Sequence, residues 1–168
     1  MKKQNDEKPK KKKPNLVGWS ITDVTQRQLQ KIAATFRVKK VKAIHKIFVI
    51  LFSELAENED FKHFTEMYDR LQEKELSSKG SIYASFDIDK VYMDRFKDTM
   101  FRFDFVDRSP FFRIVVDYVF QKYCQPALDN TEYVKKDLEE KGYKVKNIAP
   151  AMMGDIFIQI ENPKPDSK

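Results

Sequence analysis

Cysteine, histidine and glycine are all scarce in this chain of 168 residues. The single cysteine, Cys124, excludes an intrachain disulfide and favours a reducing, cytoplasmic setting. The two histidines, His45 and His63, form no cluster with cysteine at the spacing of a zinc site. Because there are only four glycines, we find no glycine-rich phosphate loop and no G-x-S-x-G nucleophile elbow. We therefore expect a protein that is not an enzyme and that holds no metal and no cofactor.

Long hydrophobic runs are absent as well. The longest, IFVILF at residues 47–52, is far shorter than the roughly 20 residues of a membrane span, so it predicts a buried core segment. The Lys-rich amino terminus is not followed by the apolar segment of a secretory signal peptide. We therefore expect no membrane association, and an apolar content of 41% with 14 phenylalanines is enough for a sizeable core.

Positive charge is concentrated in the first third of the chain, although the formal net charge is only +6. Residues 1–13 hold seven lysines against two acidic residues, and residues 14–56 hold seven basic residues against two acidic ones. The remaining residues are neutral or acidic in balance. Clustered Lys and Arg gain affinity for phosphate by displacing condensed counterions. An anionic partner is therefore expected to meet the first third of the chain.

Residues 1–15 have no large apolar residue beyond Met1, and we expect them to form a disordered basic arm. Two interpretations of this arm are open. It can be a solubilising tail, or it can lie along phosphates and add affinity without sequence information. The residues that would make those non-specific contacts are Lys10, Lys11, Lys12 and Lys13.

The most informative pattern is an internal repeat of one short strand followed by two helices. The first copy opens with a half-buried strand. Its core face carries Val17, Trp19 and Ile21, and its outward face carries Gly18, Ser20 and Thr22. Thr25 with Gln28 fits a capping box at the start of the first helix. The second helix is apolar nearly all round, so it must be buried on several sides.

The second copy repeats this pattern, with Asp89 as the N-cap of its first helix and Ser109 followed by Pro110 as the start of its second. Its strand carries Ile82, Ala84, Phe86 and Ile88 on the core face, and Tyr83, Ser85 and Asp87 on the outward face. One segment conflicts with the repeat. MFRFDFV, at residues 100–106, alternates with period two and favours a strand. If that strand forms, the second copy is degenerate or the repeat does not exist.

Neither copy could bury its own second helix, but two copies could bury each other and pair their strands. The predicted fold is mainly α, with a short two-stranded antiparallel β-ribbon of a width that the DNA major groove admits. The expected divisions are 1–15 for the arm, 16–58 for the first copy, 59–80 for an acidic linker helix, 81–126 for the second copy, and 127–168 for a small αββ appendage and tail.

The alternating strand followed by two helices, at about residues 16–56 and 81–125, resembles the ribbon-helix-helix unit of the Arc and methionine repressor superfamily. Two such units in one chain are similar to the fused form found in relaxosome accessory proteins of some conjugative plasmids. The resemblance implies a tandem pseudo-dimer that binds double-stranded DNA as a plasmid transfer or partition factor, or as a transcriptional repressor. Such a protein would be cytoplasmic, associated with plasmid or nucleoid, and either a monomeric pseudo-dimer or a homodimer.

The resemblance also implies two sets of DNA contacts. The outward strand faces would read base edges in the major groove through Gly18, Ser20, Thr22, Tyr83, Ser85 and Asp87. The start of each second helix would hold phosphate through Arg37, Lys39, Lys40 and Lys42 in the first copy and Arg108 and Ser109 in the second. These strands lack the Arg, Lys, Asn or Gln that usually make bidentate base contacts. An outward Asp87 would repel phosphate unless it accepts a hydrogen bond from a cytosine amino group.

Two other interpretations stay open. The neutral second copy and the outward Asp87 favour a non-enzymatic protein–protein interaction module whose helical core docks a partner. In that case the basic tail aids solubility or targeting or binds non-specifically. The carboxy-terminal appendage is a further possible site for a protein partner. Binding of single-stranded nucleic acid by base stacking would need several exposed aromatic rings. The pattern instead places most aromatic residues, Trp19 included, in the core.

Overall fold

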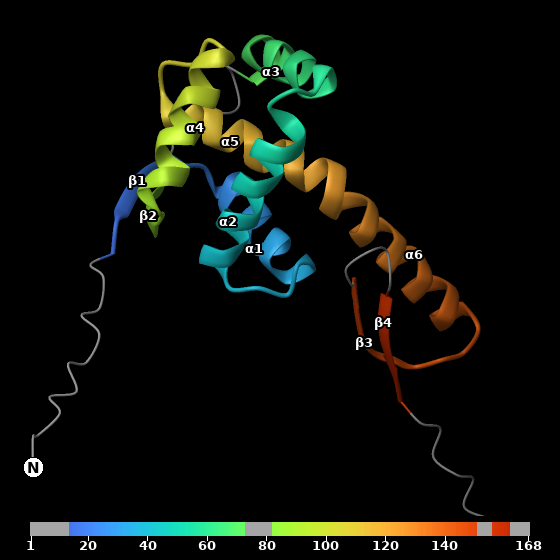
Figure 1. Ribbon diagram of the computed structural model, residues 1–168. Coiled ribbons are helices and arrows are strands. Elements are labelled where there is room, and N and C mark those ends of the chain that lie inside the picture. The colour runs from blue at the N-terminus through green and yellow to red at the C-terminus, as the bar shows by residue number, and fades with distance from the viewer. Residues whose placement is uncertain (1–13, 73–81, 151–155, 162–168) are drawn as a thin grey trace, which may run out of the picture.

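The computed structural model describes residues 14–72, 82–150 and 156–161, and it is mainly helical with a two-stranded antiparallel sheet, as the sequence predicts. A second sheet of two strands lies near the carboxy terminus (Figure 1). The elements are β1 (Leu16–Ile21), α1 (Asp23–Thr35), α2 (Lys40–Ile50), the π-helical turn η1 (Leu51–Leu55), α3 (Glu59–Gln72), β2 (Ile82–Asp87), α4 (Lys90–Arg102), α5 (Arg108–Val119), the π-helical turn η2 (Phe120–Cys124), α6 (Gln125–Glu140), β3 (Val145–Pro150) and β4 (Ile156–Ile160).

The order strand, helix, helix occurs twice, as β1-α1-α2 (the first copy) and β2-α4-α5 (the second copy). α1 and α4 are both 13 residues long, and each begins after a side chain that caps it. Asp89 accepts from the Val91 N–H at 3.1 Å, which confirms the predicted cap. In the first copy the cap is Thr22, whose oxygen accepts from the Thr25 N–H at 3.2 Å. The predicted capping box at Thr25 was therefore three residues too late, because the strand already ends at Ile21.

The turn after the first helix is the same in both copies. Arg37 and Asp104 have φ values of 51° and 59°, in the left-handed region that commonly ends a helix. The residue after each donates its N–H back to the helix, from Val38 to the Ala33 carbonyl at 2.9 Å and from Phe105 to the Met100 carbonyl at 3.2 Å. The two copies therefore share a backbone turn as well as their order of elements.

This turn also resolves the conflict at residues 100–106, where no strand forms. α4 continues to Arg102, and the left-handed turn then brings Phe103 and Phe105 onto the same ring, that of Phe111, at 5.9 and 5.2 Å between centroids. The alternation of aromatic residues thus reflects a helix end that packs on α5. The strand favoured by the period-two pattern was wrong.

β1 and β2 pair antiparallel, with Gly18 opposite Ser85 and Trp19 opposite Ala84. The inner face of this ribbon is buried, and Trp19 and Ile21 have no exposed surface. In Figure 1 the ribbon lies on the left, well away from the β3–β4 hairpin. The pairing joins one strand from each copy, so the ribbon forms only when the two copies come together.

The centre of the core is an aromatic cluster of four fully buried rings, one each from β1, α2, α4 and α5. Trp19 stacks on Phe112 with 4.5 Å between ring centroids and meets Phe96 edge-on at 5.3 Å. Phe48 stacks on Phe96 at 5.1 Å. Both copies contribute two rings, so the second helices are buried against each other, and the core assignment of Trp19 is confirmed.

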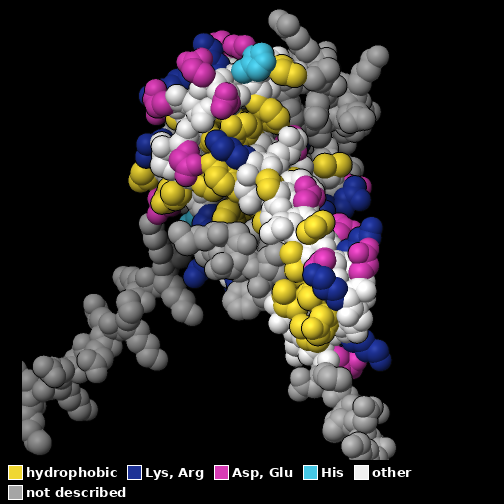
Figure 2. All heavy atoms as spheres, turned by 90° about the vertical axis from the view of Figure 1, so that its right-hand side faces the viewer, with side chains coloured by type: hydrophobic (Ala, Val, Ile, Leu, Met, Phe, Trp, Pro, Cys, Tyr) yellow, Lys and Arg dark blue, Asp and Glu magenta, His cyan; other side chains and the backbone are white. Residues whose placement is uncertain are grey.

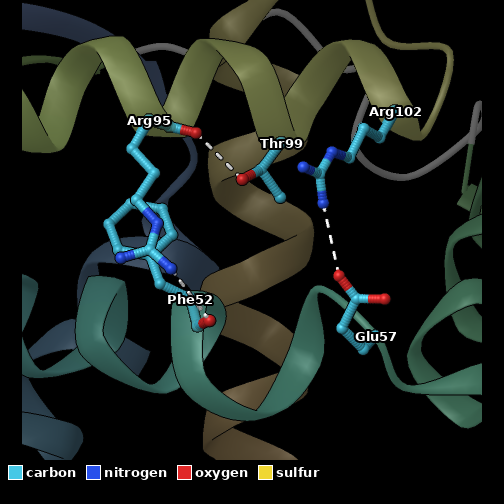
Figure 3. A network of polar contacts seen from close by, with 5 residues as sticks. All are labelled: Phe52, Glu57, Arg95, Thr99 and Arg102. Carbon is cyan, nitrogen blue, oxygen red and sulfur yellow. Dashed lines mark hydrogen bonds and ion pairs between the residues drawn. The ribbon is translucent and has the colours of Figure 1, made fainter.

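Each first helix also contacts the other copy, α1 through α5 and α4 through η1. Gln28 on α1 donates to the buried carboxylate of Asp117 on α5 at 2.5 Å. Arg95 on α4 donates to the Phe52 carbonyl of η1 at 3.4 Å and lies over the Phe52 ring, as Figure 3 shows. Nearby, Arg102 pairs with Glu57 at 3.3 Å on the surface. These polar contacts also connect the two copies outside the aromatic cluster.

α5, η2 and α6 follow one another without a break, so one helical segment runs from Arg108 to Glu140. It begins beside β1, and the chain turns away just after its end at Gly142, whose φ of 84° fits a helix end. The polar helix expected from about residue 130 thus begins at Gln125, and β3 and β4 follow it and pair antiparallel. α3, the expected acidic linker helix, packs against α5. Among the described residues, no helix is long and apolar enough to cross a membrane.

Phe112→Ala should destabilise the fold by about 3–5 kcal/mol, because it removes a ring of the second copy that packs on Trp19 and Phe48 of the first. Phe101→Ala is the matched control, since that ring is 60% exposed on α4 and should change the unfolding free energy by about 0.5 kcal/mol or less. Urea unfolding measures both. Similar small decreases for the two variants would contradict the central position of the aromatic cluster.

The thiol of Cys124 should react very slowly in the folded protein. It is fully buried, and burial raises its pKa to about 11, so the reactive thiolate is scarce at pH 8. We expect modification by a thiol reagent at pH 8 to be roughly 100-fold or more slower in buffer than in denaturing urea. Equal rates would show that this part of η2 opens freely.

Candidate nucleic-acid interface

The outer face of the ribbon carries five of the six residues predicted to read bases. Tyr83, Ser85 and Asp87 are exposed, and Gly18 and Ser20 are partly exposed. Leu16, 65% exposed, shares this face and was missed, because the predicted strand began at Val17. Continuing the alternation by one residue toward the amino terminus would have included it.

Thr22 does not belong to this face. It follows the last residue of β1, is only 8% exposed, and uses its hydroxyl to cap α1. Its hydroxyl also lies 3.0 Å from that of Thr25. The prediction that Thr22 reads bases was wrong, because the helix that follows requires its oxygen.

The two copies are related by an offset of 67 residues, the separation of the caps Thr22 and Asp89 and of the turn residues Arg37 and Asp104. At this offset, the outward residues of the two strands correspond in three pairs: Leu16 with Tyr83, Gly18 with Ser85, and Ser20 with Asp87. Because Gly18 also lies directly opposite Ser85, an approximate two-fold axis passes between those two residues. The two strands of the ribbon are thus related by approximate two-fold symmetry.

Tyr83 crosses the outer face and covers Gly18. A Cβ atom at Gly18 would lie 1.7 Å from the Tyr83 hydroxyl oxygen and 2.2 Å from its Cζ, so only glycine fits beneath the ring as placed. The ring itself is 75% exposed. The centre of the outer face is therefore occupied by a phenol that can be reached from solvent.

Asp87 has a partner at the end of the ribbon. Its carboxylate accepts from the Asn15 N–H at 2.7 Å, and the Asn15 side chain donates to the Ile88 carbonyl at 2.8 Å. The Ile88 N–H returns a hydrogen bond to the Asn15 carbonyl at 3.1 Å. The exposed acid thus closes the ribbon end, which gives it a structural role.

The start of each second helix lies beside the strand of the other copy. Lys40, the first residue of α2, has its Nζ 5.6 Å from the centroid of Phe86 on β2. Arg108, the first residue of α5, has its Cζ 5.7 Å from the Trp19 ring on β1. The rings hold these cations next to the ribbon by cation–π attraction. The ribbon is therefore flanked on both sides by a positive charge at a helix start.

These two helices also differ from α1 and α4 in their caps. Thr22 and Asp89 cap the first helices, whereas neither Lys39 before α2 nor Asp107 before α5 makes a side-chain cap hydrogen bond. A helix start without such a cap presents N–H groups and the positive end of the helix dipole. That arrangement suits an anion such as phosphate.

Ser109 is not the N-cap that the sequence predicted. α5 begins one residue earlier, at Arg108, so Ser109 lies in its first turn and Pro110 follows as the third helical residue. The Ser109 hydroxyl accepts from the Ser20 N–H at 3.0 Å and so ties α5 to the outer edge of β1. Ser109 therefore holds β1 and does not cap α5.

The remaining predicted phosphate ligands gather in the first copy. Lys39 and Lys42 are exposed at the start of α2, and Lys40 between them is partly exposed. Arg37 is exposed in the turn before the helix. Lys10, Lys11, Lys12 and Lys13 lie outside the described residues. Within the described ranges, no group of three or more His, Cys, Asp or Glu side chains is placed to hold a metal ion.

Comparison with known proteins gives no relative: no protein-family model matches the chain, and no curated protein or solved structure is significantly similar to it. The relevant geometry is an antiparallel ribbon with an accessible outer face between two uncapped helix starts that carry Lys40 and Arg108.

Gly18→Ala should have different effects in two backgrounds. In the single variant the new methyl group collides with Tyr83, and the cost of displacing that ring offsets the stability gained by replacing glycine with alanine. Together with Tyr83→Ala, it should stabilise the protein by about 0.5 kcal/mol, because alanine loses less backbone entropy than glycine in a strand. Urea unfolding of the wild type, both single variants and the double variant should give a coupling of roughly 1 kcal/mol. A coupling near zero would contradict the position of the Tyr83 ring.

Proposed function

We propose that this protein binds double-stranded DNA as a tandem ribbon-helix-helix pseudo-dimer, serving as a plasmid transfer or partition factor or as a transcriptional repressor. The observation that carries the proposal is the β1–β2 ribbon flanked on both sides by an uncapped, cationic start of a second helix. Each part alone is common in proteins. Their pseudo-symmetric combination suits a groove lined on both edges by phosphates.

The dimensions of the ribbon support insertion into the major groove. The groove is about 12 Å wide and admits a two-stranded β-ribbon. Six paired residues in each strand span roughly 20 Å at 3.4 Å per residue, enough to face several base pairs. The buried inner face, anchored by Trp19 and Phe86, leaves the outer face free to enter.

The flanking helices supply contacts that do not depend on sequence. With the ribbon in the groove, α2 and α5 point their N-termini at the two bordering backbones, where N–H groups and the cations Lys40 and Arg108 hold phosphate. Lys39 and Lys42 add to this on the first-copy side. These contacts set register and affinity.

Base readout falls to the outer face of the ribbon. Its hydroxyl groups, on Ser85, Ser20 and Tyr83, can donate or accept at base edges, and Leu16 offers an apolar contact for a thymine methyl group. Asp87 can accept from a cytosine amino group. No bidentate Arg or Asn is present on this face, so phosphate contacts contribute the larger share of affinity.

A protein–protein interaction module is the second candidate, and the appendage favours it. Figure 2 shows hydrophobic side chains gathered low on the face formed by α6 and the hairpin. Exposed apolar residues of these elements include Tyr133, Tyr143, Ile158 and Ile160. They are compatible with a protein partner bound at a distance from the ribbon, in addition to DNA or in place of it.

Lys39→Ala combined with Lys40→Ala should weaken binding to all duplex sequences alike. It should also make the slope of log K against log salt shallower by about one for each phosphate that the protein no longer neutralises. Lys135→Ala with Lys136→Ala on α6 removes the same charge far along the chain from the ribbon and should leave the slope unchanged. Fluorescence anisotropy between about 50 and 200 mM salt measures both. Equal slopes for the two variants would count against the helix starts as phosphate sites.

Selection from a randomised duplex pool separates the two candidate functions. A variant with Lys10, Lys11, Lys12 and Lys13 replaced by Ala should still enrich a short motif, because the ribbon reads it. If that variant binds no DNA at all, the arm alone is responsible and the interaction module becomes the better explanation.

A further inference from the structure

The pseudo-symmetry of the backbone is not matched by the charges beside it. At equivalent positions of the turn and the second helix, the first copy carries a cation where the second carries an acid or a neutral residue. The turn residues Arg37 and Asp104 follow the offset of 67 residues. Positions counted from the start of the second helix are instead 68 residues apart, because the second copy has one more residue between the turn and that helix. The pairs are Arg37 and Asp104 in the turn, Lys39 and Asp107 before the helix, and Lys42 and Pro110 at its third position. Only Lys40 and Arg108 are cationic in both copies. One flank of the ribbon therefore attracts phosphate more strongly than the other.

The two strands also differ on the outer face of the ribbon, and the second copy again carries the acidic residue. Across the axis, Ser20 is equivalent to Asp87, Gly18 to Ser85 and Leu16 to Tyr83. The strand β1 thus presents a neutral set with one hydroxyl, whereas β2 presents a phenol, a hydroxyl and a carboxylate. Two sets that differ at every position cannot favour the same bases in both half-sites.

We infer that this protein recognises a non-palindromic duplex and binds it in a single orientation, with α2 on the flank that holds phosphate more tightly. The inference rests on the proposed DNA binding. A reversed complex would place β2 on the half-site chosen by β1 and would exchange the lysine-rich flank for Asp107. In the single orientation that we infer, the helix that starts at Arg108 and runs to Glu140 points the appendage to one defined side of the site.

Directed cleavage tests this orientation on the motif obtained by selection with the full chain. Val106→Cys, 85% exposed just before α5, and Val41→Cys, 43% exposed in the first turn of α2, place an iron–EDTA label on opposite flanks. Both carry Cys124→Ala so that each chain has one thiol. We expect each label to cut on one side of the motif, and the two labels to cut on opposite sides.

The outcomes distinguish the inference from the proposed function. Cleavage on both sides by each label, or enrichment of a palindrome, overturns the single orientation while DNA binding stands. Retained fold without any duplex binding overturns both.

A charge variant tests the weaker flank independently. Asp107→Lys gives the second copy the residue type found in the first and should steepen the salt slope by about one. Asp129→Lys makes the same charge change on α6, remote in the chain from the ribbon, and should not. Equal slopes for the two variants would show that the second flank does not face phosphate.

Discussion

The structure depends on the burial of two apolar helices, α2 and α5, against each other. The aromatic cluster joins the two helices, since Trp19 and Phe48 come from one copy and Phe96 and Phe112 from the other. Burying a ring of this size stabilises by about 1.5–3 kcal/mol. The pairing of β1 with β2 follows, because Trp19 reaches the cluster only when the strands lie over it.

The core and the candidate interface are coupled through the ribbon. Side chains in a strand alternate between faces, so a shift of one residue would expose Trp19 and bury Ser20. The rings that fix the register, Trp19 and Phe86, are also the rings over which Arg108 and Lys40 lie. The packing that stabilises the fold therefore also sets how the flanking cations stand relative to the outer face.

Much of the fold could be predicted: periodicity indicated both strands and most of their outward residues, and the residue type indicated the cap at Asp89. The sequence predictions were wrong at two residues whose side chains form hydrogen bonds that the pattern did not indicate. Thr22 continued the alternation of the strand but caps α1, and Ser109 resembled an N-cap but binds the Ser20 amide. The alternation around Phe103 came from a helix end packing on α5. Continuity from α5 to α6 passes through a π-helical turn, for which the sequence carries no simple pattern.

Both strands of the ribbon belong to one chain, with β1 ending at Ile21 and β2 beginning at Ile82. When two separate chains supply the strands, dilution dissociates them and mixed pairs form with any similar chain present. A covalent connection replaces that bimolecular step with closure of a loop, whose entropic cost rises only slowly with loop length. The pairing of β1 with β2 within one chain therefore does not depend on the concentration of the protein.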